Sequence, residues 1–268
     1  MMKKSKYCIT DLAIEAVEGI DGVIFGKKNT IRGKCGDFLT DEIEIITEEA
    51  ARRFGKARGR YVTITSPLRL WELDHNDALM LSDIISFELR SLSDTPKRVL
   101  TVGLGNSAVT VDSLGVRTAE LVSPTRHPGK EDGVCTIIAG VAESTGITAA
   151  ELLRPLAKEL KFDTVILIDS LAAVRVQSLG RTVQISDTGI RPGSGLGKRK
   201  YSISSDSVGC PLLSMGVPTV IRAENLLIDE KSNGAIPSEL VLGAVDCDIL
   251  VESAARILSA AIEKAFTN

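Results

Sequence analysis

Short apolar segments alternate with amphipathic ones through most of this chain, and the alternation decides its fold class. The segments that predict strands are 61–65, 98–104, 134–138, 164–168, 182–185 and 211–217. Helices are predicted over 71–92, 112–121, 148–160 and 247–266, and Thr148 with Glu151 forms a capping box at the third of these. Because most of the strands are apolar throughout, both faces of the sheet must be covered. The sequence therefore predicts an α/β fold with a mixed, mostly parallel central sheet flanked by helices on both faces.

The beginning of the chain is less regular than the rest. Residues 12–58 carry glycines, charges and only short apolar bursts, so we expect a loosely patterned, β-containing lead-in there. With about 150 residues per domain as a guide, 268 residues fit one large domain or two small ones. We predict a single α/β domain over residues 12–268.

Composition excludes several classes of function. Charges nearly balance, with 32 Lys and Arg against 35 Asp and Glu, and aromatic residues make up 4% of the chain, so nothing points to a nucleic-acid partner. The five cysteines are scattered without a CxxC pair, which is typical of a reducing compartment. Asp11 and Glu15 interrupt any apolar leader, and no apolar run reaches the roughly 20 residues that span a bilayer. We expect an intracellular protein without a membrane partner.

Polar residues follow three of the predicted strands, at the edge where α/β proteins bind ligands. Asn106 and Asp112 follow one strand, Asp169 directly ends another, and Asp187 follows a third. Each acid has an ordinary alternative role, since an aspartate that ends a strand can cap the next helix. If Asp112 and Asp169 converge, repulsion keeps one carboxyl protonated, and the pair can hydrolyse a peptide bond by acid–base catalysis. The same pair could instead ligate a divalent metal ion.

Other catalytic motifs are incomplete. A GxG turn after 98–104 imitates a dinucleotide fingerprint, but Asp112 would place negative charge where the pyrophosphate must bind. A glycine-rich loop resembles a phosphate-binding loop, yet Arg199 follows its lysine where Ser or Thr is required. The only histidines are His75 and His127, which we expect on the surface, and neither an HExxH zinc motif nor a GxSxG elbow is present. We therefore predict neither a cofactor nor a bound metal.

Motifs along the chain resemble the germination (spore) protease family of endospore-forming bacteria. They are TDLAIE at 10–15, GLGN at 103–106, VTVDSLG at 109–115, TRH at 125–127, IDSLAA at 168–173, QISDTGI at 184–190, PGSGLG at 192–197 and GVPTV at 216–220. The matches occur in order with sensible spacing, so the resemblance is specific and covers most of the chain.

The resemblance implies an endopeptidase of an atypical aspartic type that degrades small acid-soluble spore proteins during germination. Family members are made as self-processing zymogens, are described as homotetramers, and have a fold similar to that of the hydrogenase maturation proteases. The implied location is the cytoplasm of the developing forespore and the spore core.

The resemblance also assigns site residues. The two proposed catalytic aspartates of the family correspond to Asp112 and Asp169. Residues expected to shape the cleft or bind substrate are Asn106, Asp187, Gly193, Ser194 and Gly195.

Family members cleave after Glu or Asp, before a bulky apolar residue followed by Ala. Asp11-Leu12-Ala13 fits this rule, so residues 1–11 are predicted to be a propeptide that is cleaved between Asp11 and Leu12. An ordinary helix start with Thr10 as N-cap explains the same residues.

Two alternatives stay open. One is a hydrogenase-maturation-like protease that recognises a metal ion through acidic residues, and the other is a catalytically silent, peptide-binding relative. The chain also departs from the family pattern: it is shorter than familiar members, and Glu143 adds a charge in a turn where they have none.

Overall fold

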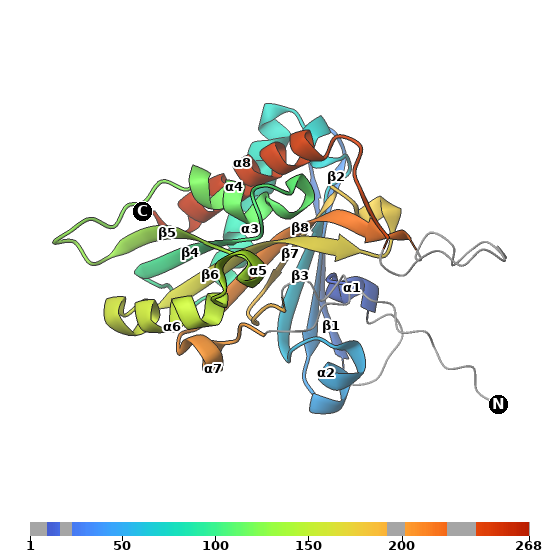
Figure 1. Ribbon diagram of the computed structural model, residues 1–268. Coiled ribbons are helices and arrows are strands. Elements are labelled where there is room, and N and C mark those ends of the chain that lie inside the picture. The colour runs from blue at the N-terminus through green and yellow to red at the C-terminus, as the bar shows by residue number, and fades with distance from the viewer. Residues whose placement is uncertain (1–9, 17–22, 192–201, 224–239, 268) are drawn as a thin grey trace.

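The computed structural model describes residues 10–16, 23–191, 202–223 and 240–267. In these residues one sheet of nine strands has the order β1-β2-β3-β7-β8-β6-β4-β5, and β9 pairs with β8 (Figure 1). The strands are β1 Val23–Arg32, β2 Asp37–Ile45, β3 Gly59–Thr65, β4 Arg98–Leu104, β5 Gly133–Gly140, β6 Thr164–Ala173, β7 Thr182–Ser186, β8 Leu212–Arg222 and β9 Val241–Gly243. The helices are α1 Ala13–Ala16, α2 Glu48–Phe54, α3 His75–Ser91, α4 Leu114–Leu121, α5 Ala142–Thr145, α6 Ala149–Leu160, α7 Ser205–Val208 and α8 Cys247–Phe266.

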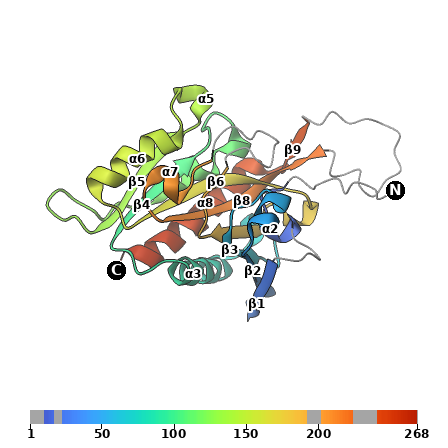
Figure 2. The same cartoon turned by 90° about the horizontal axis from the view of Figure 1, so that it is seen from below.

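The sheet is mixed, which confirms the predicted α/β class. Strands β8, β6, β4 and β5 are parallel neighbours, whereas β1, β2, β3, β7 and β8 pair antiparallel. The expectation of a mostly parallel sheet was wrong, because β3 and β7 also pair antiparallel with their neighbours. The lead-in adds a hairpin of β1 and β2, with a register shift between Phe25 and Lys28, at the opposite end of the sheet from β5 (Figure 2). In β2, buried and exposed residues alternate over much of the strand, which is the period of a half-covered sheet.

Helices cover both faces of the parallel strands, as predicted. Ile166 and Ile168 of β6 pack in a cluster with α3, α4 and α8, while Val165 and Leu167 pack on the other side with α6 and α7. This alternation is the two-residue period of a strand with both faces buried. Helices α1 and α2 form a separate small cluster with β2 and β3 around Tyr61.

Several predicted boundaries were wrong. Helix α3 begins at His75 rather than at residue 71, because Asp74 caps it by accepting the N–H of Asp77. Asp112 lies in a 3-10 turn, Thr110–Asp112, just before α4. Strand β6 continues to Ala173, so Asp169 lies inside the strand and caps no helix. The capping box of Thr148 and Glu151 is confirmed at the start of α6.

None of the helices in the described ranges is both long and apolar enough to cross a bilayer.

Candidate active site

Asp112 and Asp169 come together because β4 and β6 are parallel neighbours. Gly103 near the end of β4 pairs with Ile168, the residue before Asp169, and the chain leaving β4 turns back to place Asp112 beside the same edge. Both aspartates line one cavity of about 390 Å³, together with Asp11. The sequence prediction that these two acids share a cavity is therefore supported by their geometry.

Asp169 is a buried acid in this cavity, and its pKa is raised. Its residue is 6% exposed, and its Oδ1 accepts the N–H of Ser170 at 2.9 Å. Burial, followed by the negative charges of Asp112 and Asp11, raises the pKa of Asp169 well above its ordinary value. Asp169 therefore holds a proton at a pH where an exposed aspartate has lost it.

The loop that carries Asp112 is closed by its own backbone. Gly105 has a φ of +106°, and a Cβ there would lie within 1.9 Å of the carbonyl oxygen of Asp112, so only glycine fits. Asn106 donates its N–H to the same oxygen at 3.0 Å, and its side-chain Oδ1 accepts the N–H of Ala108 at 3.0 Å. Asn106 thus holds the loop that carries Asp112 and does not line the cavity.

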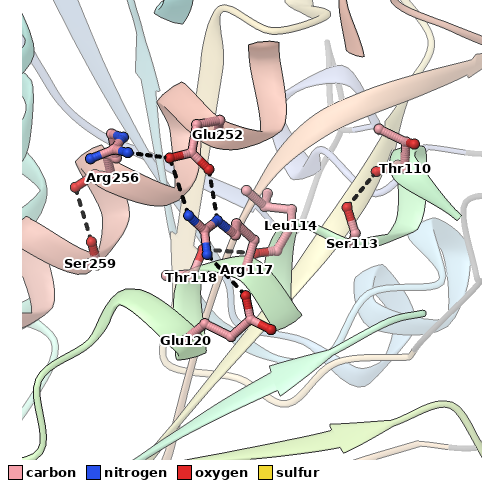
Figure 3. A network of polar contacts seen from close by, with 9 residues as sticks. All are labelled: Thr110, Ser113, Leu114, Arg117, Thr118, Glu120, Glu252, Arg256 and Ser259. Carbon is pink, nitrogen blue, oxygen red and sulfur yellow. Dashed lines mark hydrogen bonds and ion pairs between the residues drawn. The ribbon is translucent and has the colours of Figure 1, made fainter. Parts of the chain in front are cut away.

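Helix α4, which follows this loop, is tied to α8 by an ion-pair network (Figure 3). Arg117 donates to Glu252 through Nε at 2.7 Å and Nη2 at 3.3 Å, and its Nη1 reaches Glu120 at 3.1 Å. Arg256 also contacts Glu252. These contacts lower the pKa of Glu252, chiefly through its hydrogen bond with Arg117. The network fixes α4 against α8.

We expect Arg117→Met to lower the free energy of unfolding by about 0.5–1 kcal/mol at pH 7 in low salt, because both partners are 37% exposed and are screened by solvent. Because the pKa of Glu252 is depressed, this contribution is present above its ordinary value of 4.5 and is lost as pH falls through the depressed one. Urea denaturation at pH 7 and pH 3, in 0.05 and 1 M salt as chosen conditions, measures both effects. Lys28→Met, which removes an ion pair of a 76% exposed lysine, is the matched control. A cost that changes with neither pH nor salt would contradict the electrostatic account.

The segment 10–16 reaches the same cavity through Asp11. The N–H of Asp11 donates to the carbonyl of Ala172 at 2.8 Å, and the N–H of Ala172 donates to the Asp11 carboxylate at 2.9 Å. Leu12 and Ala13 are fully buried. Glu15 accepts from the N–H of Val174 at 2.8 Å and from the Ser178 hydroxyl at 2.7 Å. The segment is therefore bound along β6 and the turn that follows it, like an added chain.

Thr10 forms hydrogen bonds within the segment. Its hydroxyl accepts the N–H of Leu12 at 3.1 Å and donates to Glu15 at 2.8 Å, just before α1. The expected N-cap role of Thr10 is wrong, because α1 begins at Ala13 and the hydroxyl of Thr10 accepts the N–H of Leu12, which precedes the helix.

Two residues that sequence reasoning missed contact the carbonyl oxygen of Asp11. Lys56 donates to it through Nζ at 2.7 Å, and Gln184 donates through Nε2 at 3.0 Å. Both line a second cavity of about 90 Å³, which Asp11 and Asp169 also line. The signal that could have pointed to Gln184 is a lone amide inside the apolar strand 182–185.

Other candidates lie elsewhere. Asp187 accepts the N–H of Arg60 at 2.8 Å and lines neither cavity, so its contacts hold β7 to β3. His75 and His127 are exposed, as predicted. Glu143 lines the larger cavity from its exposed position in α5.

The expected cleft residues Gly193, Ser194 and Gly195 lie outside the described residues. Within the described ranges, no group of three or more His, Cys, Asp or Glu side chains is arranged to hold a metal ion.

Comparisons with known proteins identify the family. Residues 13–232 match the family model described as Germination protease. The chain is 36% identical to a germination protease of Clostridium perfringens over 255 residues, which cover 84% of this chain and 76% of that protein. It is 40% identical to a germination protease of Caldanaerobacter subterraneus subsp. tengcongensis over 237 residues, which cover 82% and 71%.

Among solved structures, a NiFe hydrogenase maturation protease, HycI, from Thermococcus kodakarensis KOD1 matches 68% of this chain and 99% of its own, with a TM-score of 0.41 and 17% identity. The sequence matches decide the assignment, since they extend over most of the chain and share one description. This protein belongs to the germination protease family and is a peptidase of that family.

Proposed function

We propose that this protein is an endopeptidase that degrades small acid-soluble spore proteins during germination, after removing its own residues 1–11. We propose that it acts in the forespore and spore core as a homotetramer. The observation that carries the proposal is that Asp11, the residue before the bond proposed to be cleaved, lines the same cavity as Asp112 and Asp169. This is the bond that the family's preference for an acid before a bulky apolar residue and Ala selects.

In the proposed reaction Asp112 is the general base and Asp169 is the general acid. Ionised Asp112 takes a proton from water, whose oxygen attacks the carbonyl carbon of Asp11. Protonated Asp169 then gives its proton to the nitrogen of Leu12 as the carbon–nitrogen bond breaks. One water is consumed, Asp11 gains a terminal carboxylate and Leu12 gains a free amino group. The raised pKa of Asp169 supports its role as the acid.

The contacts of Asp11 support the preference for an acid before the cleaved bond. The carboxylate of Asp11 accepts the N–H of Ala172, a fixed backbone donor of β6, and the next two side chains are fully buried. We propose that a Glu or Asp of a spore protein occupies this position once residues 1–11 have left.

We expect the purified full chain to lose residues 1–11 at mildly acidic pH, giving a new amino terminus at Leu12 in intact-mass spectra. The rate constant should not depend on protein concentration, because the segment is bound within its own chain. Asp11→Ala should slow this cleavage at least about tenfold, because it leaves the Ala172 N–H without its carboxylate acceptor.

Asp94→Ala, at an exposed position, is the control and should process at the wild-type rate. An intact chain that also fails to cut a peptide containing Glu, a bulky apolar residue and Ala would contradict the proposal. A chain that binds this peptide without cutting it would be the silent relative instead.

A further inference from the structure

We propose that Lys56 and Gln184 form the oxyanion hole of this protease, an inference that rests on the proposed cleavage at Asp11–Leu12. Lys56 Nζ and Gln184 Nε2 both donate to the carbonyl oxygen of Asp11, at 2.7 and 3.0 Å. That oxygen gains negative charge when water adds to the carbonyl carbon. Two donors at hydrogen-bond distance from it form the arrangement that stabilises such a charge.

Gln184 is held in this position by the sheet. It pairs with Gly216 of β8, and Gly216 pairs in turn with Asp169 of β6, so the three residues form one row across neighbouring strands. Residues that pair directly project to the same face, so the side chains of Gln184 and Asp169 flank a glycine. A Cβ at Gly216 would meet the carbonyl oxygen of Asp169 at 2.3 Å, and Gly216 itself lines the smaller cavity. The register therefore places an amide donor on one side of the cavity and the proposed acid on the other.

The amide of Gln184 also fixes which bond is presented. Its Oε1 accepts the N–H of Ala13 at 2.6 Å, while its Nε2 donates to the carbonyl of Asp11. One buried side chain thus contacts the backbone on both sides of Leu12. These contacts involve only backbone atoms of the segment, so Gln184 would hold the backbone of a substrate segment in the same way.

Lys56 reaches the same oxygen from the end of α2. Gly55 ends that helix in a left-handed conformation, with φ 64° and ψ 24°, and Lys56 donates its N–H back to Ala51 at 3.1 Å. Its ammonium group contacts the carbonyl oxygens of both Thr10 and Asp11, at 2.8 and 2.7 Å. A positive charge beside the second oxygen favours the tetrahedral intermediate over the neutral amide.

The alternative is that Lys56 only anchors the segment 10–16. Substitution of Lys56 has a different effect in the two roles. An anchor sets how often the segment occupies the cavity, whereas an oxyanion donor sets the rate of cleavage while the segment is bound. Hydrogen exchange at the amides of Leu12 and Ala13 reports occupancy, and the first-order rate of release of residues 1–11 reports cleavage.

We expect Lys56→Ala and Gln184→Glu each to slow self-cleavage of the full chain by about 10²–10³-fold with the two amides still protected, since each removes one donor. Gln184→Glu keeps an oxygen for the Ala13 N–H and replaces the amide donor to Asp11 by a carboxyl oxygen, which also brings acidic character beside Lys56. Ethylammonium should restore part of the lost rate to Lys56→Ala. Lys56→Arg should retain part of it, and Lys158→Ala, at an exposed position of α6, should match the wild type.

Three results would overturn the inference, and each is distinct. If Lys56→Ala cleaves within about fivefold of wild type while Asp169→Asn is inactive, the protease proposal stands and the oxyanion hole is wrong. If the rate falls with loss of amide protection and without rescue by ethylammonium, Lys56 is an anchor. If the wild type neither cleaves itself nor cuts a spore-protein peptide, the proposed function fails and takes this inference with it.

Discussion

Asp169→Asn is expected to reduce self-cleavage by about 10²–10⁴-fold, the contribution of a positioned general acid. Asparagine keeps the shape of the side chain and an oxygen that can accept the Ser170 N–H, which Asp169 accepts at 2.9 Å. It cannot deliver a proton to the nitrogen of Leu12. Asp112→Asn should have an effect of similar size, because it removes the proposed base.

Asp169→Asn is also expected to stabilise the folded protein at neutral pH. The pKa of Asp169 is raised in the folded state by burial and by the charges of Asp112 and Asp11. The folded state therefore binds a proton more tightly than the unfolded state, and stability falls as pH rises from the ordinary pKa of 3.8 through the raised value. An asparagine side chain has no such proton to lose, so the Asp169→Asn variant avoids this loss of stability.

Thermal melting from pH 3 to pH 8 tests the account. The melting temperature of Asp169→Asn should exceed that of the wild type at pH 7, and the difference should disappear near pH 3, where both side chains are neutral. Asp206→Asn, at an exposed position of α7, should change neither melting nor cleavage. An inactive variant that is no more stable at pH 7 would mean that Asp169 carries no penalty of burial. A fully active variant would remove it from the chemistry.

The sequence placed Asp112 and Asp169 after neighbouring strands, and their convergence was a condition of the predicted chemistry. Apolar strands alternating with helices implied a sheet buried on both faces, and parallel neighbours bring their following residues to one edge. That rule alone selected Asp187 as well, which lines neither cavity, so the choice of Asp112 and Asp169 also depended on the family resemblance. The error over Asp169 has a simple cause. An acid after Val165–Ile168 resembles the end of a strand, yet the backbone of β6 continues to pair with β8 from Ser170 to Ala173, while the carboxyl faces the cavity.

Lys56 and Gln184 could not be predicted in the same way. Their residue types are common, and no fixed spacing links them to either aspartate or to Asp11. Their contacts depend on which strands are neighbours and in what register, since Gln184 reaches the cavity only because β7 pairs antiparallel with β8. A lone amide in an apolar strand marks Gln184 as unusual, but no local pattern shows which strands will be its neighbours. The regular secondary structure of the lead-in was likewise not predicted, because the β1–β2 hairpin is stabilised by the pairing of β2 with β3.

Gly115→Ala is expected to destabilise the protein by about 3 kcal/mol, at the upper end of what an added methyl costs in a packed interior. In an ordinary helix this substitution is stabilising by about 1 kcal/mol, so the sign alone tests the packing. Gly115 lies in α4, and a Cβ there would lie within 2.2 Å of the carbonyl oxygen of Ile168 and 2.4 Å of that of Leu104. Both are backbone atoms of β6 and β4, which cannot rotate aside as a side chain can.

Helix α4 must therefore move away from the two strands whose closeness brings Asp112 and Asp169 together. We expect cleavage to fall along with stability, even in the fraction of Gly115→Ala that is still folded, because Asp112 shifts with the start of α4. Urea denaturation and the self-cleavage rate below the unfolding transition separate the two effects. Gly26→Ala is the control, since a Cβ there meets mainly the side chain of Glu42, at 3.2 Å, and should cost little. A Gly115→Ala protein that is as stable as the wild type would show that α4 has room to spare, and the close packing would then not be what sets the distance between the aspartates.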